Sequence, residues 1–268
     1  MKYFGGCDVG STYTKTVILD ENGAIVAANT IKSKINSAQS AKAGLDQAIA
    51  DAGLKEISDL TYLIGTGYGR NKVPQADENI SEISCHAMGV HVTDPSVRAI
   101  IDIGGQDVKG IAVDTDGTVK TFAMNDKCAA GTGRFFESMA NAFEMSLEEF
   151  SKLSLTAENV IPITAQCTVF AESEVVSLVA QNKDVSDIIH GLNVSVASKV
   201  GALAARLGKD HPGEYMMTGG VAKNQGIIQA LEEKLGAKLY ICEEAQLCGA
   251  LGAALFAYEK CKGESVQK

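Results

Sequence analysis

Short apolar runs alternate with polar, glycine-containing turns through the first part of the chain. Residues 3–9 form one such run, which ends in an aspartate and a Gly-Ser-Thr turn, and residues 14–19 resume an apolar pattern typical of a strand. The segment Asp20-Glu21-Asn22-Gly23 then predicts a tight turn, because Asn-Gly is the strongest short hairpin signal. With residues 24–31 as the returning strand, the pattern predicts a strand, a tight polar loop and a hairpin.

The same unit occurs a second time. Residues 99–103 are again an apolar strand that carries an acidic residue and leads into glycines, and residues 108–113 and 118–124 predict two strands joined by a turn. The two units align at one constant offset of 94 residues. Five matches in register, turns included, indicate duplicated β-units, one from each of two domains. The aligned pairs are Asp8 and Asp102, Gly10 and Gly104, Lys15 and Lys109, Asp20 and Asp114, and Gly23 and Gly117.

The rest of the chain predicts helices and a few further strands, so the expected fold class is α/β. Residues 185–207 carry an apolar stripe at helical spacing, which we expect in the core: Ile188, Ile189, Leu192, Val196, Val200 and Leu203. Further helices are expected at 38–52, 131–143, 147–153, 172–181, 224–235 and 246–258, and further strands at 60–64, 214–218 and 238–241. We expect a first domain at residues 1–94, to which the C-terminal helix 246–262 could return, and a second domain at 95–268.

Composition narrows the class of protein. Apolar residues make up 46% and charged residues 21% of the 268 residues, as in ordinary globular proteins, and the net charge of -9 argues against a general nucleic-acid or anionic-membrane binder. No targeting pattern or spanning apolar stretch is evident, so we expect a cytoplasmic protein that is not in a membrane. The seven cysteines show neither regular spacing nor a Cys-x-x-Cys pair. Any metal site must therefore be assembled from distant segments or from more than one chain.

Three glycine turns follow apolar strands and are candidates for nucleotide binding. A strand that ends in a carboxylate and continues into such a turn lets backbone amides bind phosphate oxygens while the carboxylate orients a hydrated Mg²⁺. We therefore predict Asp8 and Asp102 as catalytic, magnesium-orienting carboxylates, Lys15 as a charge near the phosphates, and Gln106 as the residue that orients a water. The turn residues expected to contact the nucleotide are Gly10, Ser11 and Thr12, then Gly104 and Gly105, and finally Gly219, Gly220 and Lys223.

Two other nucleotide-binding folds are disfavoured. No Gly-x-x-x-x-Gly-Lys-Ser/Thr segment occurs, which excludes a P-loop. Neither early turn has the Gly-x-Gly-x-x-Gly spacing that opens a helix, which argues against a dinucleotide fold.

The stretch from Asn125 to Phe135 places Cys128 beside a glycine-rich turn where a helix is expected to start at Ala129. Helix N-termini favour thiolates, anionic clusters and phosphates, so a redox ligand and a nucleotide contact could share this segment, with Gly131 and Gly133 near the nucleotide. The alternative interpretation is an ordinary capped helix with a small buried cysteine.

The three turns resemble the phosphate 1, phosphate 2 and adenosine motifs of the sugar kinase, Hsp70 and actin superfamily. More closely, residues 102–107, 125–135 and 166–174 resemble the ATP-dependent activators of 2-hydroxyacyl-CoA dehydratases and the related ATPase subunits of benzoyl-CoA reductases. The resemblance runs over nearly the whole chain. It implies two duplicated ribonuclease H-like domains with an ATP cleft between them.

The resemblance also implies an iron-sulfur protein. In the family, a homodimer holds a single [4Fe-4S] cluster to which each chain gives two cysteines, and the matching positions here are Cys128 and Cys167. Two cysteines per chain cannot supply the usual four thiolates, whereas two copies can. ATP hydrolysis would then drive a low-potential electron from a ferredoxin or flavodoxin to a 2-hydroxyacyl-CoA dehydratase in an anaerobic cytosol. Cys7, Cys242 and Cys248 are expected to be buried, inert thiols. Cys85, which resembles a metal pair with His86 only superficially, and Cys261, near the end of the chain, are not needed for the cluster.

Three alternatives stay open at this point. A small-molecule kinase of the same superfamily would transfer the γ-phosphoryl group and be indifferent to iron. A benzoyl-CoA reductase-type ATPase subunit would serve a reductase rather than a dehydratase. An ATP-switched assembly or sensor protein would bind ATP without fast turnover.

Overall fold

The computed structural model describes residues 1–164, 167–208, 214–242 and 244–262. It divides into two compact units. The first comprises Met1–Val97, Val113–Lys120 and Cys242–Lys268, and the second comprises Arg98–Ala112 and Thr121–Ile241. The chain therefore passes between the units several times.

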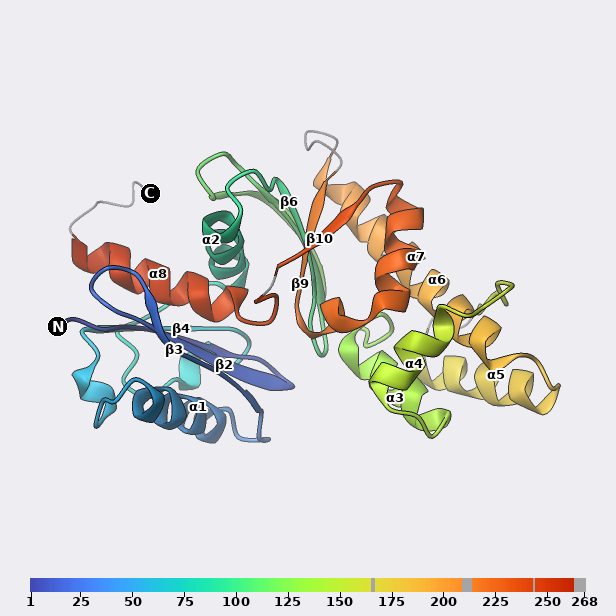
Figure 1. Cartoon of the computed structure of the whole chain (residues 1–268), viewed down its shortest axis with the longest axis horizontal. Helices are drawn as coiled ribbons and strands as arrows, with labels where there is room; N and C mark the ends of the chain where they lie inside the picture. Colours follow the sequence, from blue (N-terminus) through green and yellow to red (C-terminus); the bar gives the residue numbers. More distant parts are fainter. Residues whose placement is uncertain (165–166, 209–213, 243, 263–268) are drawn as a thin grey trace. The chain divides into compact units, whose positions relative to one another are not determined.

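The first unit is built on a five-stranded sheet in the order β3-β2-β1-β4-β5 (Figure 1). Strand β1 is antiparallel to β2 and parallel to β4, and the hairpin continues antiparallel from β2 to β3. The turn predicted at Asn22-Gly23 is confirmed, with Gly23 at a φ of 81°. The strands are Phe4–Val9, Tyr13–Leu19, Ile25–Lys32, Tyr62–Thr66 and Glu78–Asn79 for β1 to β5.

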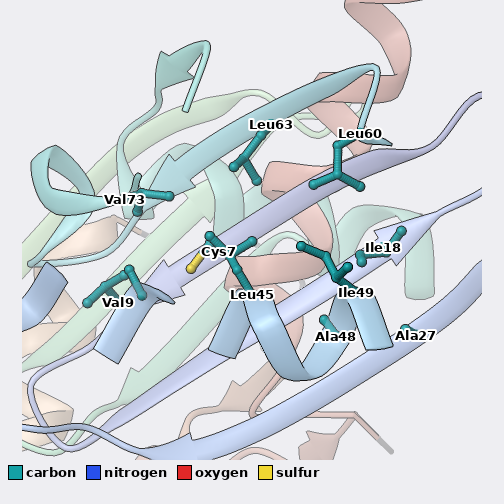
Figure 2. Close-up of a cluster of buried hydrophobic side chains, with 11 residues drawn as sticks. Cys7, Val9, Ile18, Ala27, Leu45, Ala48, Ile49, Leu60, Leu63 and Val73 are labelled. Carbon is teal, nitrogen blue, oxygen red and sulfur yellow. The ribbon is translucent and has the colours of Figure 1, made fainter. Parts of the chain in front are cut away.

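Helices cover both faces of this sheet. Helix α1 (Ser37–Asp51) packs its buried side, including Leu45 and Ile49, against Cys7, Val9 and Leu63, as Figure 2 shows. Helices α2 (Glu82–Thr93) and α8 (Cys248–Lys262) belong to the opposite core, with Phe4, Val17 and Ile64. Small residues bring these backbones close together, because a side chain at Gly6, Gly89 or Gly252 would collide with a neighbouring backbone.

The second unit repeats this topology with the strand order β10-β9-β6-β7-β8. Here β6 is antiparallel to β7 and parallel to β9, as β1 is to β2 and β4. Asp102 lies opposite Lys109 in the β6–β7 register, just as Asp8 lies opposite Lys15. The duplication predicted from the 94-residue offset is confirmed. The strands are Ala99–Ile103, Val108–Val113, Val119–Asn125, Tyr215–Thr218 and Leu239–Ile241 for β6 to β10.

The helices of the second unit pack in a connected group. Helix α6 (Val185–Ala204) contacts α7 (Gln225–Leu235) and α4 (Leu147–Ser154), and α3 (Gly133–Ala142) contacts α5 (Thr168–Ala180). The six residues of the predicted α6 stripe are all buried, which confirms their place in the core. Within the described chain, the segment Val185–Leu207 is long and apolar enough to cross a membrane. In its apolar 18-residue stretch, 56% of the segment is buried inside the protein. Packing in the core accounts for that apolar character.

Four short 3₁₀ helices complete the described elements. They are η1 (Ile57–Asp59), η2 (Arg70–Lys72), η3 (Ala205–Leu207) and η4 (Gly220–Lys223). Two of them, η2 and η4, each follow a glycine turn at the end of a strand, namely β4 and β9. These strand ends carry the candidate site.

Candidate functional site

The end of β1 holds a buried ion pair in the first unit. Lys15 Nζ lies 2.9 Å from Asp8 Oδ2, and 18% of the lysine side chain and 5% of the aspartate side chain are exposed. The Gly10 amide donates to the Tyr13 carbonyl at 3.2 Å, which closes the turn. Thr12 is buried, and its hydroxyl makes no hydrogen bond within the described residues. Asp8, Lys15 and the turn therefore lie together at the end of β1.

The end of β6 has the same turn in the second unit but a different charge balance. Lys109 Nζ contacts Asp102 Oδ2 at 3.2 Å and Asp107 Oδ2 at 2.7 Å, and only 4% of the lysine side chain is exposed. The other oxygen of Asp102 accepts a hydrogen bond from Thr218 Oγ1 at 2.9 Å. Both oxygens of Asp102 are thus held by protein groups. Gly104 repeats the closure, with its amide donating to the Asp107 carbonyl at 2.9 Å.

The third turn lies directly against Asp102. Gly219 has a φ of 85°, and a Cβ there would lie 2.9 Å from Asp102 Oδ1 and collide with the Ile103 carbonyl. Only glycine fits both the conformation and the space. Gly220 and Lys223 are exposed at the ends of η4, so they lie near this turn and face solvent.

The segment containing Cys128 is hydrogen-bonded to the turn at Gly104 and Gly105, which follows β6. The Gly133 amide donates to the Gly104 carbonyl at 2.8 Å, and the Arg134 amide donates to the Gly105 carbonyl at 2.9 Å. A Cβ on Gly133 would lie 3.2 Å from the Gly104 oxygen and 3.3 Å from Gly105 Cα. The first amides of α3 therefore bond to the turn carbonyls, and a shift of the turn would be transmitted to the start of α3.

The start expected at Ala129 is wrong, whereas the expected range of 131–143 is close to the observed helix. Helix α3 begins at Gly133, after a cap at Thr132, so Cys128 lies more than one turn before the helix. The stabilising field of a helix end falls off within its first turn, which leaves Cys128 without that support. Cys167 is the N-cap residue of α5, so the field of a helix N-terminus does act on its thiol.

Cys128 and Cys167 are exposed and share a charged neighbour. Lys199 on α6 is half-buried, which lowers the pKa of its ammonium group, while the charges of Cys128 and Cys167 act in the opposite direction. Both thiols therefore lie within electrostatic reach of one lysine. Among the described residues, no group of three or more His, Cys, Asp or Glu side chains could hold a metal ion.

The remaining cysteines are not all alike. Burial raises the pKa values of Cys7 and Cys85 to about 12, so these thiols stay protonated and inert, as expected of Cys7. Cys242 differs, because a hydrogen bond with Cys248 is the main cause that lowers its pKa to about 6. The inert role expected of Cys242 stays a prediction.

The sequence singles out residues 65–70 as a loop that could contact a phosphate or a partner, or could be an ordinary loop at a domain edge. It does not reveal that this loop is the first unit's counterpart of the turn at Gly219. Thr66 lies opposite Asp8 in the β1–β4 register, as Thr218 lies opposite Asp102 in the β6–β9 register. A glycine at positive φ follows each threonine, namely Gly67 at 84° and Gly219 at 85°. A Thr-Gly pair after an apolar strand could have revealed the match. The two Thr-Gly pairs are separated by more than 94 residues, so they do not align at the offset that relates the two hairpins.

Comparison with known proteins decides the family. Residues 6–257 match the model of the BadF/BadG/BcrA/BcrD ATPase family. The chain belongs to this family. It is 47% identical, over 96% of its length and 98% of the relative, to an activator of lactoyl-CoA dehydratase from Anaerotignum propionicum.

Solved structures agree with this assignment. The activator of 2-hydroxyisocaproyl-CoA dehydratase from Clostridium difficile, crystallised with bound ADPNP, is 42% identical, with a TM-score of 0.90 and coverage of 97% of this chain and 96% of that one. A ROK family glucokinase from Streptomyces griseus has a TM-score of 0.59 at 14% identity, covering 96% of this chain and 99% of that one. This BadF/BadG/BcrA/BcrD-type ATPase therefore has the two duplicated ribonuclease H-like domains of the actin, Hsp70 and sugar kinase fold.

Proposed function

We propose that this chain hydrolyses ATP to drive a low-potential electron onto a 2-hydroxyacyl-CoA dehydratase, and so acts as its activator. The observation that carries the proposal is the pair of hydrogen bonds from Gly133 and Arg134 to the turn at Gly104 and Gly105. They join a candidate phosphate-binding turn to the segment that carries Cys128. The 47% identical dehydratase activator and the ADPNP-bound relative support the same assignment.

The nucleotide is assigned to the duplicated turns. Asp8 and Asp102 would orient Mg²⁺ through water, Gln106 would orient the attacking water, and Lys15 would lie near the phosphates. Asp8 Oδ2 is bonded to Lys15, whereas both oxygens of Asp102 are bonded to protein groups. Asp8 therefore has more capacity for a new ligand. The other phosphate and adenosine contacts are assigned to Gly10, Ser11, Thr12, Gly104, Gly105, Gly131, Gly133, Gly219, Gly220 and Lys223.

The cysteines would hold one [4Fe-4S] cluster per homodimer, with Cys128 and Cys167 from each chain. Such a cluster supplies a one-electron carrier. The exposed apolar side chains of α5, next to Cys167, support a second copy on this face, because Val169, Phe170 and Val176 are 67%, 69% and 59% exposed. Lys199 would offset part of the negative charge of the thiolates.

The partners follow from this role. A ferredoxin or flavodoxin would donate the electron, and a 2-hydroxyacyl-CoA dehydratase component would accept it. Because an exposed iron-sulfur site is open to oxidants, we assign the protein to the cytoplasm of an anaerobic cell.

Anaerobic purification tests the proposal. The wild type should be brown, with about four iron and four sulfide per dimer, and should hydrolyse MgATP. Cys128→Ala and Cys167→Ala should each lose iron and the broad visible absorbance, whereas Cys261→Ala is the matched control and should keep both. A full iron complement in either ligand variant would refute the cysteine assignment. Phosphorylation of an added sugar or acid by an iron-free wild type would favour a kinase instead.

A further inference from the structure

The loop that follows β4 wraps around the end of β1. The Gly69 amide donates to the Val9 carbonyl at 2.9 Å. A side chain at Gly67 would collide with Asp8 Oδ1 and approach the Val9 carbonyl to 2.8 Å. The backbone of this loop therefore touches the strand end that carries Asp8, within the first unit.

The loop is the first unit's copy of the turn at Thr218 and Gly219. In both loops, the threonine lies opposite the aspartate in the sheet register. In both, the glycine that follows it has a positive φ and contacts an oxygen of that aspartate. One bond differs. Thr218 donates to Asp102, whereas the Thr66 hydroxyl is fully buried and lies against the thiol of Cys85.

The charge of this loop is uncompensated. Lys15 is paired with Asp8, and Lys109 is paired with Asp102 and Asp107. Arg70 has no carboxylate within ion-pairing distance in the described part of the chain, and its Nη1 donates to the Gly67 carbonyl at 3.2 Å. The guanidinium is therefore held beside the residue that touches Asp8, with most of its donors available for an anion.

We propose that the Thr66–Arg70 loop is a fourth nucleotide-binding turn, in which the guanidinium of Arg70 binds the terminal phosphate of ATP. Arginine suits this task because its planar donors match phosphate oxygens in pairs. The inference rests on the proposed ATPase function and specifies which residue distinguishes ATP from ADP.

The test compares dissociation constants for MgATP and MgADP, measured by calorimetry on the anaerobically purified full chain. Arg70→Ala should weaken MgATP binding about tenfold or more while changing MgADP binding less than about threefold. Arg70→Lys should give an intermediate loss. Lys72→Ala is the matched control, because it removes an exposed cation from the same 3₁₀ helix, and it should bind both nucleotides like the wild type. Circular dichroism melting checks that each variant is folded.

Other outcomes would overturn the inference. Equal losses for ATP and ADP would place Arg70 away from the terminal phosphate, as would unchanged affinities. If Arg70→Ala binds and hydrolyses ATP normally but no longer activates a dehydratase, the loop serves the partner protein instead. If Arg70→Ala does not fold, Arg70→Gln, which removes the charge but keeps a polar side chain, gives the same ATP-to-ADP comparison. Failure of the wild type to bind MgATP would refute the proposed function itself, which separates the two results.

Discussion

Replacing Gly67 with alanine tests whether the loop after β4 holds Asp8 in place. Gly67 has a φ of 84°, and its added Cβ would collide with Asp8 Oδ1. Gly53 is the matched control in the same unit, because its φ is 72° and nothing lies within 4 Å of the Cβ position. Gly53→Ala therefore reports the backbone strain alone, and the difference between the variants reports the contacts with Asp8 and the Val9 carbonyl.

The magnitudes follow from these contacts. A left-handed conformation costs an alanine about 1–2 kcal/mol, so Gly53→Ala should lower the free energy of unfolding by about that amount. Gly67→Ala bears the same strain and must also displace Asp8 from Lys15. Breaking a mostly buried pair costs about 3–5 kcal/mol, and some of this is recovered because Lys15 can reach solvent. We expect a total of about 3–5 kcal/mol for Gly67→Ala.

Urea unfolding followed by circular dichroism measures the stabilities, and MgATP turnover measures the function. Gly67→Ala should lose most turnover, whereas Gly53→Ala should keep it at a temperature where both variants are folded. Equal destabilisation of the two variants would refute the argument that the loop backbone fixes Asp8. Full turnover in Gly67→Ala would show that the position of Asp8 is not needed for hydrolysis.

Three further predictions concern charges and contacts outside that loop. Asp102→Asn should destabilise the protein by about 2–4 kcal/mol, more than Asp8→Asn, because Asp102 is bonded through both oxygens; urea unfolding compares them. Gly133→Ala, which puts a methyl group 3.2 Å from the Gly104 oxygen, should weaken MgATP binding about threefold or more, measured by calorimetry. The depressed pKa of Cys242, about 6 against an ordinary 9.0, means that the unfolded chain binds more protons between these values. The free energy of unfolding should therefore rise from pH 6 to pH 9, and the part of this rise that comes from Cys242 should be absent in Cys242→Ser. The same slope against pH in the variant and the wild type would refute the lowered pKa of Cys242.

The sequence predicted those features that depend on local spacing. The offset of 94 residues between Asp8 and Asp102 predicted matching hairpins, and the Asp–Lys pairs are indeed opposite one another in both sheets. The α6 stripe was predictable because a helix with one buried face shows the 3.6-residue period directly. Assignment of the nucleotide to these turns stays a prediction.

Helix α2 could not be found in the same way. It is largely apolar, includes a glycine, and packs against α8, so it lacks the single apolar face that periodicity detects. Its close approach to α8 depends on Gly89 and Gly252, whose partners are backbone atoms of distant residues. Contacts between segments so far apart in sequence leave no local pattern.

The start of α3 shows a related limit. Ala129 and Ala130 favour a helix by propensity, but Gly131 and Gly133 follow them, and the helix begins only at Gly133. The amides at Gly133 and Arg134 instead bond to the carbonyls of Gly104 and Gly105, a partner set by tertiary structure. This displaces Cys128 from the helix and makes its loop an extension of the second turn.

Duplication has kept the backbone of the two units and changed their charges. In both, an aspartate on the first strand faces a lysine on the second and a threonine on the parallel neighbour. Only in the second unit do the threonine and an additional carboxylate, Asp107, complete the set of bonds. Because a buried carboxylate with all its bonds made has little to gain from a ligand, the second unit is built for rigidity at Asp102. The first unit keeps unused hydrogen-bonding capacity at Asp8 and Arg70, so we expect a bound anion to change the bonding there more than at Asp102.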